Sequence, residues 1–368
     1  MYVRMIMKWF NIGILLSVCT AAQAEDAPDR RSLADNMIAR AIHHDGRLWL
    51  LTDSGDLSSI TDNASERVEE SVPGPVLDIC QSNRKLYALS CDTKACGNWR
   101  LNQQEQGQWR LLTSVASNGE QILALACDAS SNQVLSAKRL IDLRGSRVSV
   151  THLSEAISAP YVAASLVTPT AIFLGLNSGE WGGGLRRITR ATGKVTNVEH
   201  LDGGLCSGPL SSDCDPVTGL AVIPWKPTCV AASIGIVHFA ARGRIVEVCG
   251  QQVTTLLVKA YGDDDMWRFK DQDQDQDQDQ DNEEKEPFPS VAFFGLNARG
   301  QSLLAVGIDG LYEINEDAPA KVFTLPEFRE VDGVYLNDAD PDTILVLTSI
   351  NRRRSVSGAA PLFVRRGE

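Results

Sequence analysis

After its first 24 residues the sequence lacks any apolar run of the roughly 18 residues that a membrane-spanning helix needs. Apolar residues at helical spacing are also nearly absent, which argues against a helical fold. There is no Gly-x-Ser-x-Gly elbow, no phosphate-binding glycine loop and no His-Glu-x-x-His motif. No local motif therefore indicates an enzyme class, although a site assembled from distant segments would escape such motifs.

The first 24 residues have the three parts of a secretory signal peptide. A basic start precedes an apolar stretch at 12–18, and Ala22-Gln23-Ala24 matches a small-x-small cleavage site. Glu25 is then the expected mature N-terminus, and the protein is expected to be periplasmic or secreted. A lipoprotein with Cys19 as its lipidated residue is the alternative.

Eight cysteines follow the predicted signal peptide, and an even number in an exported chain predicts disulfides. The spacing favours the pairs Cys80 with Cys127, Cys91 with Cys96, Cys206 with Cys214, and Cys229 with Cys249. The alternative is a zinc site, but no Cys-x-x-Cys motif occurs and the only paired histidines are His43 and His44.

The charge of the chain is concentrated in one segment. The net charge is −12, and loss of Arg4 and Lys8 with the signal peptide brings the mature chain to −14. Residues 263–286 contain twelve acidic and three basic residues, so they account for −9 and the remainder carries only −5. This balance argues against a DNA or RNA surface.

Three segments share one pattern, in which a short apolar strand, a polar turn with glycine and a second strand follow one another. They are 50–60, 174–188 and 305–314. Internal similarity at a spacing of 40 to 50 residues predicts a propeller or a solenoid.

Alternating apolar runs divide the mature chain into seven units. They are 37–70, 76–115, 122–153, 161–202, 210–261, 291–326 and 331–366. Seven units of four short strands close into a ring without free sheet edges. The pattern resembles the seven-bladed β-propeller superfamily of WD40-like and YVTN-like rings. This resemblance implies one all-β domain over residues 25–368, with four-stranded antiparallel blades; an eight-bladed ring and two packed sandwiches are alternatives.

The acidic segment at 263–286 includes a low-complexity tract of alternating Asp and Gln at 271–281. The charges of the tract repel one another and the tract has no apolar residue to bury, so we expect a disordered insertion between two blades. Weak calcium binding is the alternative, but the glycine and the closing glutamate of an EF-hand loop are not at the required offsets.

Two less ordinary residues interrupt the fourth unit. Glu180 and Trp181 lie among four glycines where other units have a simple turn. A carboxylate beside an indole can bind a sugar by stacking and hydrogen bonding. The alternative is a wide hairpin in which Trp181 covers a neighbouring blade and Glu180 is solvated.

The fifth unit supplies three further candidates. Asp215 follows Cys214 and could present a carboxylate to a ligand, and Trp225 lies between two prolines. The alternative for both is a rigid surface loop. His238 lies in an apolar strand, where a lone histidine is more often a core or channel residue than a base.

Together these patterns predict a monomeric, exported propeller that binds an envelope protein or a glycan through the loops of units four and five. We expect no nucleic-acid partner, no transmembrane segment in the mature chain and no resident cofactor. One alternative is a lactonase-like hydrolase with a metal at the central channel, held by Glu180, Asp215 or His238. Another is a structural part of an envelope complex.

Overall fold

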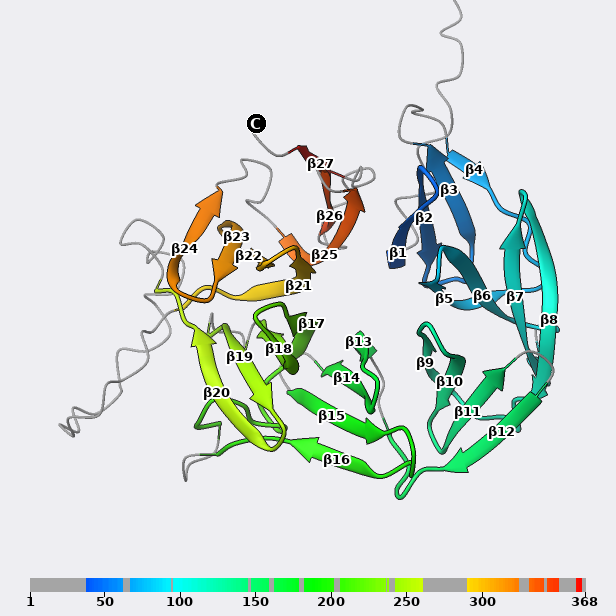
Figure 1. The fold of residues 1–368 in the computed structure, drawn as a ribbon, viewed down its shortest axis with the longest axis horizontal. Helices are drawn as coiled ribbons and strands as arrows, with labels where there is room; N and C mark the ends of the chain where they lie inside the picture. Colours follow the sequence, from blue (N-terminus) through cyan, green and yellow to red (C-terminus); the bar gives the residue numbers. More distant parts are fainter. Residues whose placement is uncertain are drawn as a thin grey trace, which may run out of the picture.

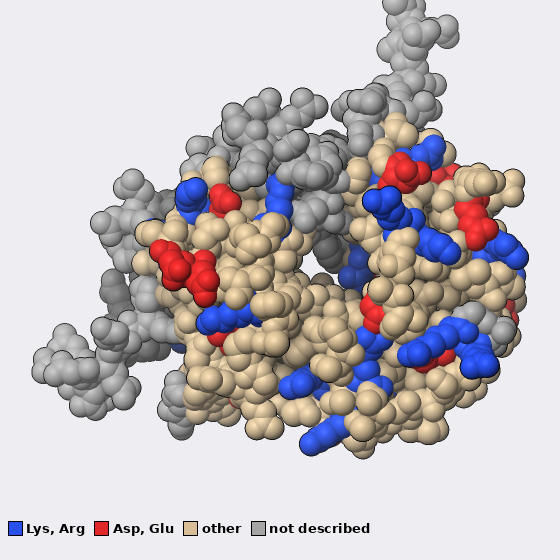
Figure 2. Space-filling view, viewed as in Figure 1, with Lys and Arg blue, Asp and Glu red and all other residues tan. Residues whose placement is uncertain are grey.

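The computed structural model describes residues 38–61, 67–93, 95–144, 147–158, 162–178, 182–201, 206–235, Val237, 242–260, 290–323, 331–340, 343–350 and 362–365. These residues form antiparallel sheets of consecutive strands, placed around a common axis (Figure 1). The space-filling view shows a hollow at the centre of the ring (Figure 2). The chain is thus an all-β propeller, as the sequence predicts. The described segments include no helix long and apolar enough to cross a bilayer.

The first three blades run from the innermost to the outermost strand. Blade one has β1 (Ile38–His44), β2 (Arg47–Thr52), β3 (Leu57–Thr61) and β4 (Arg67–Glu69). Blade two has β5 (Val76–Ser82), β6 (Lys85–Cys91), β7 (Asn98–Glu105) and β8 (Gln108–Ala116). Blade three has β9 (Ile122–Cys127), β10 (Asn132–Ser136), β11 (Arg139–Arg144) and β12 (Arg147–His152).

The next three blades repeat this order. Blade four has β13 (Val162–Val167), β14 (Ala171–Asn177), β15 (Gly183–Thr189) and β16 (Val195–Val198). Blade five has β17 (Val217–Ile223), β18 (Lys226–Ile234), β19 (Arg244–Cys249) and β20 (Gln252–Leu257). Blade six has β21 (Phe293–Arg299), β22 (Ser302–Gly307), β23 (Gly310–Asn315) and β24 (Ala318–Phe323).

The last sheet departs from the predicted pattern. Its described residues form three strands, β25 (Val331–Asp340), β26 (Thr343–Ile350) and β27 (Leu362–Arg365). Within the part of the chain that the structure describes, the prediction of seven four-stranded blades is therefore corrected to six such blades. The three-stranded sheet lies between blades six and one, with β25 beside both β21 and β1 (Figure 1).

Each innermost strand has a β-bulge near its start. The bulged residues are Ala39, Leu77, Leu123, Ala163, Thr218, Phe294 and Asp332. A bulge bends a strand and increases its twist. The bulge at Asp332 shows that β25 has the same backbone irregularity as the six other innermost strands.

The core consists of apolar clusters between neighbouring blades. Trp49 of β2 and Leu86 of β6 belong to the cluster of blades one and two, and Leu101 of β7 packs with Ile141 of β11 between blades two and three. Similar clusters join blades three to six in sequence. The middle strands are therefore buried on both faces. This explains why β2 and β6 read as continuous buried runs rather than alternating ones.

All four cysteine pairs that the spacing favours are disulfides. Cys80–Cys127 joins the innermost strands of blades two and three, and Cys229–Cys249 joins β18 to β19. Cys91–Cys96 and Cys206–Cys214 close local loops. The predicted disulfide framework is thus confirmed.

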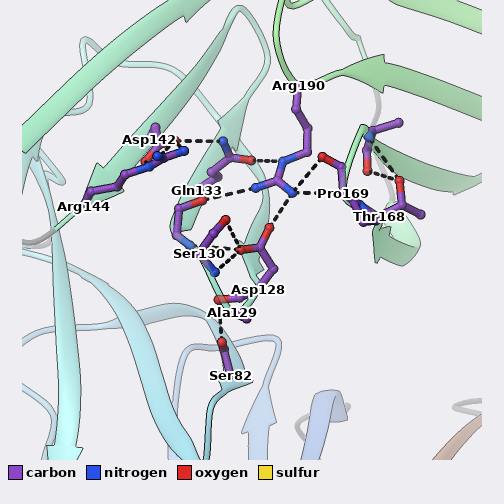
Figure 3. Close-up of polar contacts among 12 residues, drawn as sticks. Ser82, Asp128, Ala129, Ser130, Gln133, Asp142, Arg144, Thr168, Pro169 and Arg190 are labelled. Carbon is purple, nitrogen blue, oxygen red and sulfur yellow. Dashed lines mark hydrogen bonds and ion pairs between the residues drawn. The ribbon is translucent and has the colours of Figure 1, made fainter.

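A polar network on the hairpin turns joins blades two, three and four (Figure 3). Arg190, which follows β15, forms an ion pair with Asp128 in the β9–β10 turn. It also donates to Gln133 Oε1 at 2.8 Å and to the carbonyl of Thr168 at 2.9 Å. From blade two, the Ser82 hydroxyl donates to the Asp128 carbonyl at 2.5 Å. The network connects neighbouring blades through polar contacts in addition to their apolar cores.

Candidate functional site

The structure describes two of the five predicted site residues. Glu180, Trp181 and His238 lie outside the described residues. Asp215 lies two residues before β17 and Trp225 two residues after it. A seven-residue strand spans about 20 Å, so Asp215 and Trp225 lie on opposite faces of the ring.

Trp225 is half-buried rather than presented as a contact residue. It packs against the apolar cluster of blades five and six, which includes Ile223 and Leu296. A shared binding surface for Trp225 and Asp215 is therefore excluded by their separation. Trp225 instead covers the edge of the core at the β17–β18 turn.

Asp215 is buried in an ion pair. Its carboxylate accepts a hydrogen bond from Arg244 at 2.6 Å and from the backbone N–H of Ser211 at 2.7 Å. The two side chains are only 6% and 1% exposed. Arg244 also donates to the carbonyls of Pro209 and Gly208, at 2.8 and 3.2 Å.

This arrangement gives Asp215 a structural role. The negative charge of a buried carboxylate is compensated by the guanidinium bound to it, and removal of either partner would leave the other as an uncompensated buried charge. Asp215 thereby anchors the segment 206–216 to β19, and it is not presented to a channel metal. Arg244 was not among the predicted residues, since nothing in its local sequence signals a partner 29 positions away.

The blade-four turn packs directly against this anchored segment. The N–H of Gly183 donates to the Ser212 carbonyl at 3.2 Å, and that of Gly184 donates to the Asp215 carbonyl at 2.8 Å. The structure therefore brings together the two segments that the sequence singles out, the glycine run of blade four and the disulfide-closed segment between blades four and five.

The close approach explains the run of glycines. Gly182 and Gly184 have φ angles of 75° and 72°, which favour glycine. A Cβ atom would lie 2.3 Å from the backbone of Asp213 at Gly182 and 2.6 Å from Ser212 Cα at Gly184. The glycines thus allow tight backbone packing beside Glu180 and Trp181, which precede them in the sequence.

Charged groups surround the two segments. Burial lowers the pKa of Arg186 on β15, while the charges of Glu199, Glu155 and Asp213 act in the opposite direction. Glu199 accepts a hydrogen bond from the Ser212 hydroxyl at 2.6 Å. The loops of blades four and five therefore lie in an environment that contains the half-buried cation of Arg186 and several carboxylates.

One group within the described part of the chain has the residue types of a metal site. The ligand atoms of Cys229, Glu247 and Cys249 lie within 4.8 Å of one another. The two cysteines form a disulfide and Glu247 forms an ion pair with Lys226. A disulfide offers no thiolate to zinc, so this group does not fit a zinc site in the oxidised protein.

No protein-family model matches the chain, and the comparison with curated proteins finds no match. Solved structures of similar fold include YCF48 bound to D1 peptide, at 10% identity and a TM-score of 0.53 over 86% of this chain and 90% of that chain. At this identity the likeness concerns the fold alone.

Two longer proteins give weaker matches. The extracellular domain of the one-component system BT4673 from B. thetaiotaomicron matches at 13% identity and a TM-score of 0.49, over 86% of this chain and 38% of its own. PorZ, a surface component of the type-IX secretion system of Porphyromonas gingivalis, matches at 12% identity and a TM-score of 0.49, over 90% and 39%. The chain thus spans about two fifths of the length of these proteins.

Proposed function

We propose that this chain is an exported, monomeric propeller that binds an envelope protein or a glycan through the loops of blades four and five. The observation that carries the proposal is the packing of the blade-four glycine run onto segment 211–215. This contact places two unusual loops side by side on one face of the ring. Such binding uses side chains of the loops and needs no resident cofactor.

The described parts of these loops are held in place before any ligand binds. Segment 206–216 is closed by Cys206–Cys214 and anchored by the Arg244–Asp215 ion pair. A preorganised surface avoids much of the entropy cost of ordering loops on binding. This preorganisation favours a recognition surface formed by the loops of blades four and five, which have the least regular sequence of the chain.

Export is supported by the disulfides. Four disulfides connect the described cysteines, and disulfides persist in oxidising compartments such as the periplasm or the extracellular space. Together with the signal-peptide pattern of the first 24 residues, they support a periplasmic or secreted protein.

We also propose that β25–β27 acts as a seventh, incomplete blade. Its innermost strand has the same bulge as the other six, and it lies beside β21 and β1. With this sheet in place, blades six and one each have a neighbour on both sides.

Substitution of the two tryptophans tests the proposed binding face. Trp181→Ala removes an indole from the blade-four loop, whereas Trp225→Ala removes one from the opposite face. Tryptophan is enriched among the residues that dominate binding energy at interfaces, so Trp181→Ala should weaken binding at least about tenfold. The assay measures capture on a glycan array and on immobilised envelope proteins, with thermal unfolding as the check on folding.

Trp225→Ala is the matched control and should retain binding even if it lowers stability. Equal binding by the parent and a folded Trp181→Ala variant would refute the assignment of the face. Loss of binding in Trp225→Ala alone would place the surface at the other end of β17.

A further inference from the structure

The outer strands of blades two and three present basic and aliphatic side chains together. β8 contains Arg110, Leu111 and Leu112 close to its start, and β12 contains Arg147, Val148 and Val150. We call these six residues the basic–aliphatic rim. The same order occurs in blade one, where the exposed Val68 follows Arg67 at the start of β4.

The aliphatic side chains of the rim are unusually exposed for this molecule. Leu111 is 43% exposed and Val150 is 45% exposed, and Leu112 and Val148 are similar. In contrast, Val195 of β16 is 7% exposed and Val253 of β20 is fully buried. Among the described outer strands of blades four to six, β24 has comparably exposed apolar side chains, Val322 and Phe323. Five of the eight large apolar side chains described as exposed lie on the outer strands of blades one to three. Clustering of this kind marks an interaction surface, whereas scattered single residues do not.

The rim lies in the basic part of an acidic protein. Residues 76–201 contain thirteen Lys or Arg and nine Asp or Glu, a balance of +4, although the whole chain carries −12. More Lys and Arg side chains are visible over β5–β16 than over β17–β24 (Figure 2). The charge of this sector is therefore opposite in sign to that of the chain.

Two carboxylates of blade three are already bound to other arginines. Asp142 forms an ion pair with Arg144, and Asp128 forms one with Arg190. Arg147 is exposed and forms no ion pair within the described segments. Arg110 is 71% exposed and only 3.6 Å from Glu105, a solvent-exposed pair that contributes little. The guanidinium groups at the rim are thus available to an anionic partner.

We propose that the basic–aliphatic rim docks on the surface of an anionic phospholipid bilayer. Its cations complement the lipid phosphates, and its leucines and valines lie beside them on the outer strands, which follow one another round the ring (Figure 1). The apolar residues are aliphatic, whereas the centres of protein interfaces are enriched in tryptophan and tyrosine. This chemistry favours a lipid surface over a protein partner.

Vesicle flotation tests the proposal directly. The chain expressed from its full sequence is mixed at low salt with vesicles of phosphatidylcholine alone or of phosphatidylcholine with phosphatidylglycerol. We expect flotation only with phosphatidylglycerol, and loss of flotation as the salt concentration rises. Arg110→Glu with Arg147→Glu should weaken binding about 25-fold or more, because each basic residue near such a surface contributes about fivefold. Leu111→Ser with Val148→Ser should weaken it about tenfold.

The matched control lies on the outer strand of blade six. Lys321→Glu with Val322→Ser makes the same change in β24, beside the exposed acidic pair Glu316 and Asp317, and it should leave flotation unchanged. All substituted positions are exposed, so unchanged thermal unfolding verifies folding. Three results would overturn the proposal: no flotation with phosphatidylglycerol, equal flotation of every variant, or rim-dependent capture of an envelope protein without vesicle binding.

Discussion

At the scale of single residues, Asp128 shows how a surface turn becomes sensitive to acid. Burial on its own would raise the pKa of this carboxyl group. Hydrogen bonds from Ser130, from the N–H of Ser131 and from Arg190 outweigh it and lower the pKa from 3.8 to about 2. The folded state therefore releases this proton more readily than the unfolded chain does.

The stabilisation from Asp128 should be complete above pH 4 and disappear as the pH falls through 2, because the folded pKa is the lower one. We expect about 1 kcal/mol of the free energy of unfolding to be lost in this window, after allowance for solvent screening. Asp128→Asn should remove this part of the pH dependence, measured by urea unfolding at several pH values. Asp317→Asn, at an exposed turn, is the control. An identical pH profile of the Asp128 variant and the parent would contradict the assignment.

Asp215 illustrates what the sequence does not reveal at this scale. The residue types around it predict an exposed loop, and the rigid disulfide-closed loop is indeed present. The buried ion pair with Arg244 depends on how β19 lies against the loop, which is a tertiary relation. Sequence spacing singles out the segment but cannot show that its carboxylate binds Arg244.

At the scale of elements, the glycine run of blade four is a packing device. Gly184 is buried with φ of 72°, whereas Gly119 has φ of 69° but no atom within 4 Å of the place that a Cβ would occupy. The two positions share the same backbone requirement and differ in their surroundings. Alanine substitutions at the two positions therefore separate the free-energy cost of a left-handed backbone from that of tight packing.

Gly119→Ala should lower the free energy of unfolding by about 1 kcal/mol, the cost of a left-handed backbone for alanine. Gly184→Ala should cost about 1 to 3 kcal/mol more, because its Cβ would lie 2.6 Å from Ser212 Cα. Denaturant unfolding of both variants measures the difference. Equal losses would show that segment 211–215 moves away freely and that the two loops are not firmly packed.

Strands and disulfides were predictable where the sequence pattern that indicates them is local. β2 and β3 agree with the strands expected from their apolar runs and glycine turn, and the cysteine pairs follow from short loops or matching strands. The grouping of Trp225 with Asp215 did not take the order of strands into account. One strand separates Trp225 from Asp215, so a count of strands would have put the two on opposite faces.

At the scale of the whole molecule, the ring was predictable from its repeats but the number of complete blades was not. Neighbouring blades pack on one another through apolar clusters, so each sheet of the repeat depends on the sheets beside it. The last sheet has three described strands instead of four. Apolar periodicity predicts a repeat in this region but does not say how many strands pair within it.

Removal of residues 331–368 tests whether the three-stranded sheet closes the ring. Without β25, both β1 and β21 would lose a neighbour and expose apolar surface of blades one and six. We expect a lower midpoint and a broader transition in thermal unfolding followed by circular dichroism, because repeat arrays lose cooperativity when an interface is removed. Deletion of residues 263–286, which the sequence predicts to be an insertion between blades, is the control and should leave the midpoint within a few degrees. If the shortened chain unfolds as sharply and at the same temperature as the parent, the six four-stranded blades are sufficient and β25–β27 is not part of the cooperative ring.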